Sequence, residues 1–165
     1  MNVLQLCCFT NFWPDCEVES WDLRNGRDIF NIPDGYANNF DLVCAAPPCD
    51  QFTKANSHSW DQYPEHFIKI ALRCFEICLQ SKSKWFLEQP PGRIETFIPE
   101  LSKFRTILWK SPSSNKEYVI YSNFLILQTT SSRYGRNPKK LQVNMTKKQR
   151  EAWDPDLVNE IRVFV

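Results

Sequence analysis

Short apolar runs separated by polar, proline- and glycine-containing segments recur along the first half of the chain. This pattern is typical of strands that a sheet buries. It predicts strands at residues 2–7, 17–22 and 40–46, with a short strand at 28–32, and a further strand at 84–88.

A helix is predicted between the last two of these strands, at residues 64–81. Pro64 suits the first helical position and Glu65 favours the positive end of the helix dipole. Apolar residues recur there at helical spacing: Phe67, Ile68, Ala71, Leu72, Cys74, Phe75, Cys78 and Leu79. Strand, helix and strand form a βαβ unit, whose parallel strands end at the same edge of the sheet. We therefore expect a doubly wound α/β domain with a mostly parallel sheet.

The following segment predicts a helix at 94–104 that Pro99 breaks or restarts. Residues 105–110 and 117–127 are rich in Ile, Tyr and Val and are joined by a short Ser/Pro/Asn segment. This composition predicts a C-terminal β-hairpin.

Residues 129–150 have the composition of a loop. Thr146 can cap a last helix, with a break or restart near Pro155. Three residues of that helix are expected to face the core: Leu157, Val158 and Ile161.

Two of the predicted strands end in a Pro-Pro pair next to a side chain that can take part in catalysis. Pro47-Pro48 leads directly to Cys49, and Glu88 stands just before Pro90-Pro91. Proline fixes φ and removes a backbone donor, so each pair stops its strand and holds the next loop in one shape. A thiol and a carboxyl group would then share the crevice at the carboxyl ends of the strands, where open α/β sheets bind ligands. The simpler interpretation of Cys49 is a structural cysteine in an ordinary turn.

These motifs resemble those of a known enzyme family. Pro47-Pro48-Cys49 with Phe52-Thr53 resembles the Pro-Pro-Cys loop of the DNA cytosine-5 methyltransferases. Glu88-Gln89-Pro90 resembles their Glu-Asn-Val motif, in the Glu-Asn-Pro form of small phage-encoded members. The resemblance covers roughly residues 1 to 125. It implies a Rossmann-like S-adenosylmethionine-dependent methyltransferase fold, as a single domain over 1–165 without a separate target-recognition domain.

The resemblance also implies a mechanism and a substrate, DNA containing cytosine. Cys49 would be the nucleophile that adds to carbon 6 of the base, which turns carbon 5 into a nucleophile for methyl transfer. Glu88 would bind the base at N3 and its amino group as charge develops. In duplex DNA the target base would have to flip out of the stack.

The implied cofactor is S-adenosyl-L-methionine. Matching positions assign its site to Leu6, Phe9, Asp22, Asp28 and Pro47, with Asp22 at the ribose hydroxyls and Asp28 at the adenine ring. The family's first motif carries Phe-x-Gly-x-Gly, but residues 8–14 contain no glycine. Either the cofactor is held in an unusual way or this lobe has lost it.

Charge is distributed unevenly along the chain although the net charge is +1. Residues 1–50 carry eight acidic and two basic side chains, whereas 119–150 carry seven basic and no acidic ones. The basic segment suits phosphate binding, although a solvated charged loop has the same composition. We expect nucleic-acid contacts from Arg93, Lys116, Arg133, Arg136, Lys139 and Lys140.

Seven cysteines without an export signal favour reduced thiols in a cytoplasm, that of the host cell if the chain is phage-encoded. No membrane association and no metal site are expected. Two further functions stay open. One is a catalytically inactive methyltransferase-like protein that binds DNA or a host protein as a counter-defence factor, and the other is an enzyme acting on a free cytosine nucleotide.

Overall fold

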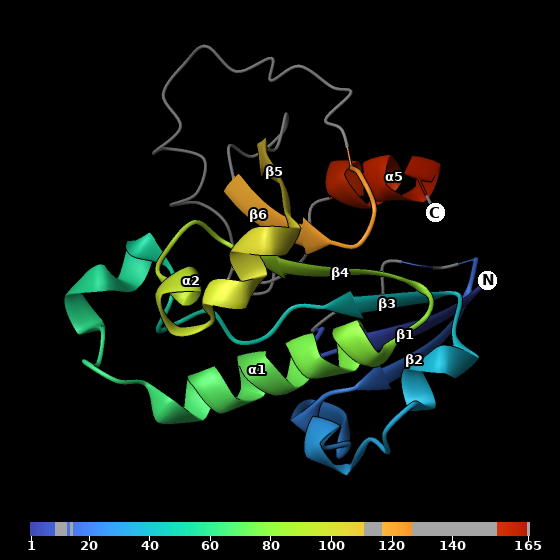
Figure 1. Cartoon of the computed structure of the whole chain (residues 1–165), viewed down its shortest axis with the longest axis horizontal. Helices are drawn as coiled ribbons and strands as arrows, with labels where there is room; N and C mark the ends of the chain where they lie inside the picture. Colours follow the sequence, from blue (N-terminus) through green and yellow to red (C-terminus); the bar gives the residue numbers. More distant parts are fainter. Residues whose placement is uncertain (9–12, 14, 111–116, 127–154, 165) are drawn as a thin grey trace.

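The described residues form an α/β structure built on one mixed six-stranded sheet (Figure 1). The computed structural model describes residues 1–8, 13, 15–110, 117–126 and 155–164. The strand order is β2-β1-β3-β4-β6-β5. The strands are β1 Asn2–Leu6, β2 Glu17–Trp21, β3 Leu42–Ala45, β4 Lys84–Gln89, β5 Arg105–Lys110 and β6 Glu117–Ser122.

The sheet combines a parallel part with an antiparallel part. β2, β1, β3 and β4 pair in parallel, whereas β6 runs antiparallel to both β4 and β5. The predicted β5–β6 hairpin pairing is confirmed, with β6 ending at Ser122. The expectation of an α/β class is likewise confirmed.

Two helices cover opposite faces of the sheet (Figure 1). α1 (Glu65–Gln80) lies within the predicted range and buries its apolar stripe on one core cluster. α5 (Pro155–Phe164) places Leu157, Val158 and Ile161 in the cluster on the other face, as expected. Leu72 and Leu79 of α1 are 40% and 48% exposed, so they lie outside the buried stripe.

The predicted strand at 28–32 is wrong, because this stretch forms the 3-10 turn η2 (Ile29–Asn31). The Asp28 carboxylate caps that turn by accepting from the Phe30 amide, an alternative that competes with strand pairing. Two similar turns, η1 (Leu23–Asn25) and η3 (Tyr36–Asn39), complete the connection from β2 to β3.

The expected break at Pro99 is confirmed. A short helix, α2 (Ile94–Phe97), is followed by the 3-10 helix η5 (Pro99–Phe104). The expectations for 129–150 and for a cap at Thr146 fall outside the described residues. Within the described ranges, no helix has the length and apolar character needed to cross a membrane.

Candidate functional site

The strand order places a switch in chain direction between β1 and β3. The chain leaves β1 for β2 on one side and then returns to β3 on the other side. In open α/β sheets, ligands bind outside the carboxyl ends of the strands at such a switch. Cys8 follows β1 there, and the Pro47–Cys49 loop follows β3.

Cys49 lies in a tight turn just beyond β3. Its carbonyl accepts from the amides of Phe52 (2.8 Å) and Thr53 (2.9 Å). The residue is half-buried. The turn therefore fixes the backbone of Cys49 while leaving part of the residue accessible.

Glu88 lies on the neighbouring parallel strand β4, which ends at the same edge of the sheet as β3. The last β3–β4 pair joins Ala45 to Leu87, so Glu88 is the next residue along β4. Cys49 is four residues beyond Ala45, at most about 15 Å of chain. The Glu88 side chain is only 8% exposed. The structure thus brings the two predicted catalytic residues to one edge, as the βαβ arrangement predicts.

Hydrogen bonds join the two Pro-Pro loops to each other. The Gln89 side chain donates through Nε2 to the Pro47 carbonyl at 2.6 Å. Beyond it, the Arg93 amide donates to the Phe52 carbonyl (2.9 Å) and the Lys54 amide to the Pro91 carbonyl (3.1 Å). The Cys49 loop is therefore anchored on the strand that carries Glu88. Sequence reasoning missed this role of Gln89.

The buried thiol of Cys8 has Glu88 and Asp22 as electrostatic neighbours. Burial raises the pKa of Cys8, and nearby Cys7, Glu88 and Asp22 raise it further. Both carboxylates therefore lie within electrostatic range of one sulfur. The thiol itself donates to the carbonyl of Leu6 at 3.4 Å.

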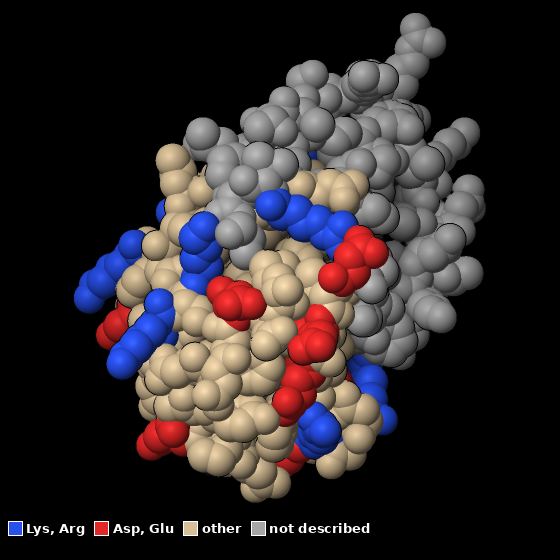
Figure 2. All heavy atoms as spheres, turned by 90° about the vertical axis from the view of Figure 1, so that its right-hand side faces the viewer, with Lys and Arg blue, Asp and Glu red and all other residues tan. Residues whose placement is uncertain are grey.

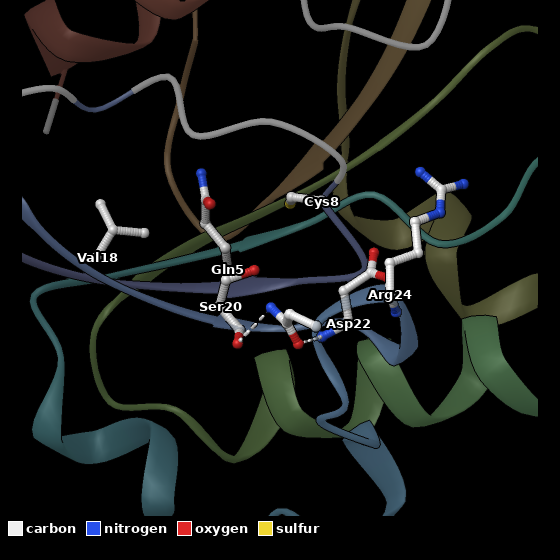
Figure 3. A pocket seen from close by; sticks show the side chains of 7 residues that line it. Gln5, Cys8, Val18, Ser20, Asp22 and Arg24 are labelled. Atoms are coloured by element: carbon white, nitrogen blue, oxygen red, sulfur yellow. Dashed lines mark hydrogen bonds between the residues drawn. The ribbon is translucent and has the colours of Figure 1, made fainter. Parts of the chain in front are cut away.

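A hollow of about 260 Å³ opens beside Asp22 at the β1–β2 side of the sheet. Gln5 and Cys8 project into it from the side of β1 that faces away from α1 (Figure 3). Gln5 is 1% exposed, and its Nε2 has no hydrogen-bond partner in the described part of the chain. A buried donor without a partner is costly, so a ligand acceptor at this position would be favoured. The full lining is Gln5, Cys8, Val18, Ser20, Asp22, Arg24 and Asn25.

The residues predicted to bind the cofactor are only partly gathered here. Asp22 lines the hollow, and its Oδ1 also caps η1 by accepting from the Arg24 amide at 2.9 Å. Asp28 caps η2 instead. Leu6 is fully buried in the core on the α1 face, and Pro47 is buried at the start of the Pro47–Cys49 loop. Phe9 lies outside the described residues.

Sequence reasoning also missed Gln5, Ser20 and Asn25. A polar residue in the otherwise apolar run of β1 was the available signal for Gln5. Ser20 and Asn25 carried no such signal, because their part in the hollow depends on the turn η1.

Of the residues predicted to contact nucleic acid, only Arg93 falls in the described part. Its guanidinium donates to two backbone carbonyls, those of Gln51 and Asp61. The others, Lys116, Arg133, Arg136, Lys139 and Lys140, lie outside it. On the described part of the face shown in Figure 2, Lys and Arg are interspersed with Asp and Glu.

All seven cysteines fall in described positions and none is in a disulfide. Burial raises the pKa of Cys44 and Cys78, and a hydrogen bond with Cys7 together with burial raises that of Cys74. Cys74 and Cys78 lie in the core, as their helical spacing predicts. Across the described ranges, no cluster of three or more His, Cys, Asp or Glu side chains could hold a metal ion.

These buried thiols are expected to make the folded protein less stable at alkaline pH. Unfolded thiols ionise near pH 8.5, whereas the buried ones stay protonated in the folded state, so each lowers the free energy of unfolding by about 1.4 kcal/mol per pH unit above that value. We expect urea unfolding to show a steep loss of stability between pH 8 and 10. Cys78→Ala should make the loss shallower by one thiol's share, and identical slopes for the two proteins would contradict the prediction.

Comparisons of the sequence with models of known protein families and with curated proteins found no match.

Proposed function

We propose that the protein transfers a methyl group from S-adenosylmethionine to carbon 5 of cytosine in DNA through a covalent adduct on Cys49. One observation carries the proposal: the Cys49 loop is hydrogen-bonded to the strand that presents Glu88, through Gln89 and Pro47. A thiol and a buried carboxyl group at one sheet edge are what this chemistry requires. The strand order, with its switch at β1, supports the finer expectation of a doubly wound, Rossmann-like fold.

The residues around the hollow fit part of the cofactor. The Asp22 carboxylate can accept from hydroxyl groups, and the unpartnered Nε2 of Gln5 can donate to an acceptor. The hollow is just below the common range of about 300–1,000 Å³ for ligand pockets, so it suits a fragment of the cofactor rather than all of it. S-adenosylmethionine would supply the electrophilic methyl group, and Glu88 would hold the base.

The decisive experiment is methyl transfer from radiolabelled S-adenosylmethionine to cytosine DNA, together with calorimetric titration of the cofactor with and without that DNA. Incorporation of label at carbon 5 of cytosine supports the proposal. If the protein neither binds the cofactor in the presence of DNA nor transfers label, the enzyme proposal fails.

Asp22→Ala is expected to weaken S-adenosylmethionine binding about tenfold or more, the effect of losing a charge-assisted hydrogen bond. The measurement is isothermal titration calorimetry with cytosine DNA present. Asp22 also caps η1, so Asp22→Asn is the matched control, because it keeps a capping oxygen and removes the charge. Wild-type affinity in both variants would remove Asp22 from the cofactor site.

A catalytically inactive binding protein is the second candidate. It is favoured by the hydrogen bonds of Asp22 and Asp28. Both carboxylates cap short turns, so both have a structural role without any cofactor. This candidate predicts DNA or protein binding that is unchanged by loss of the Cys49 thiol.

A further inference from the structure

We infer that Arg93 is a positioning residue that latches the loop Gln51–Asp61, which includes the 3-10 helix η4 (Lys54–Ser59), and thereby fixes the backbone that carries the Cys49 thiol. The latch is a property of the fold, and its effect on catalysis rests on the proposed function. It gives Arg93 a role different from the nucleic-acid contact that the sequence predicts.

The guanidinium of Arg93 spans the mouth of this loop. Its Nε donates to the Gln51 carbonyl at 2.9 Å, and its Nη2 donates to the Asp61 carbonyl at 2.6 Å. These carbonyls belong to the first and last residues of the loop. A planar guanidinium with donors in a fixed fork can hold two such acceptors at once, which a single ammonium cannot do with the same geometry.

The guanidinium of Arg93 stacks on the ring of Trp60. Its ring centroid lies 4.4 Å from the Arg93 Cζ atom, a cation–π distance. Its indole Nε1 donates across the loop to the Thr53 carbonyl at 3.1 Å. The Phe97 ring centroid is 5.1 Å from the same Cζ atom. Arg93 is thus held by two rings while it holds the loop.

The side chain of Gln51 also joins the two ends of the loop. Its Oε1 accepts from the Asp61 amide at 2.7 Å, and its Nε2 donates to the Ser59 carbonyl at 3.2 Å. Both ends of the loop are therefore pinned by side-chain hydrogen bonds in addition to those of Arg93.

The latch is connected directly to Cys49, which lies two residues before the loop begins. The Cys49 carbonyl accepts from the amides of Phe52 and Thr53, which lie inside the loop. The Arg93 amide in turn donates to the Phe52 carbonyl. Movement of the loop would break this turn and shift the Cys49 peptide, so the latch holds the backbone that carries the thiol.

The test compares Arg93→Lys and Arg93→Ala in the full-length protein, with Arg73→Lys as a matched control. Arg73 also donates to a backbone carbonyl, that of Ile32, but from α1. Three quantities are measured: hydrogen exchange of peptides spanning 50–61, the rate of covalent trapping on 5-fluorocytosine DNA, and DNA affinity. Both Arg93 variants should exchange about tenfold faster in this segment. Both should trap about 100-fold more slowly, the scale of a 1 Å misplacement of a reacting group.

The lysine variant separates a latch from a phosphate contact. Lysine keeps the positive charge, so a phosphate contact would survive in Arg93→Lys and be lost in Arg93→Ala. DNA affinity would then stay near the wild-type value in the lysine variant and fall in the alanine variant. That pattern overturns the inference, as does unchanged exchange, or faster exchange with trapping unchanged. Trp60→Leu removes the stacked ring without altering charge and should shift exchange and trapping in the same direction, so the inference is testable even if Arg93→Ala does not fold.

Failure of the latch is distinguishable from failure of the proposed function. If the wild-type protein traps no DNA, the proposed function fails. The latch is then decided by hydrogen exchange and by the rate at which iodoacetamide alkylates Cys49, read by mass spectrometry. Cys49 should be alkylated severalfold faster in the Arg93 variants, in which the loop is released. Equal rates in wild type and both variants would overturn the inference.

Discussion

Cys49→Ser is expected to lower covalent complex formation with 5-fluorocytosine DNA by a factor on the order of 10³ or more, the scale seen when a catalytic nucleophile is removed. A serine hydroxyl is far less acidic than a thiol, so the anion that must attack carbon 6 is not populated. Fluorine at carbon 5 blocks the loss of a proton that would release the enzyme, so the adduct persists. The complex is measured as a band that survives denaturing electrophoresis, with S-adenosylmethionine present.

Cys16→Ser is the matched control, because Cys16 is also half-buried but lies just before β2, at the amino end of that strand. It should trap at the wild-type rate. Trapping by Cys49→Ser at that same rate would exclude Cys49 as the nucleophile and leave the binding-protein candidate as the better account.

The placement of Cys49 and Glu88 could be predicted from the sequence because it depends on local rules. Two apolar runs and one helical stripe define a βαβ unit, and parallel strands must end at the same edge. The Pro-Pro pairs then mark where each strand stops. The same local reasoning placed the break at Pro99 and the buried stripe of α5.

The contacts that organise the site could not be predicted in this way. The bonds from Gln89 to Pro47 and from Arg93 to Gln51 join segments about 40 residues apart, and no periodicity records them. Arg93 was predicted to contact nucleic acid, whereas in the structure its guanidinium stacks on Trp60 and donates to the carbonyls of Gln51 and Asp61.

The stretch 28–32 carries two competing local signals, and the strand predicted there is wrong. Its Ile-Phe-Asn-Ile run favours a strand, but Asp28 precedes it and Pro33 follows it. An aspartate that can bond the amide two residues on offers the backbone a turn in place of a ladder. The structure adopts that turn.

Gly92→Ala is expected to be the most destabilising single substitution near the site. An added Cβ would lie 1.7 Å from the Phe52 carbonyl oxygen and 2.6 Å from its carbon. Neither atom can yield easily, because Phe52 is fully buried and its ring packs against Phe67 and Phe97. The bridge between Thr53 and Gly92 must therefore open, at a cost of about 2–4 kcal/mol in the free energy of unfolding.

Gly26→Ala is the matched control for this change. Gly26 has a φ of 78°, so alanine is strained there, but an added Cβ would meet nothing within 4 Å. Its cost should be about 1–2 kcal/mol, that of a left-handed conformation alone. Denaturant unfolding gives both values, and trapping on 5-fluorocytosine DNA should fall in Gly92→Ala but not in Gly26→Ala. Equal stability of the two variants would show that the Pro-Pro loops separate easily, and Cys49 would then owe its position to β3 alone.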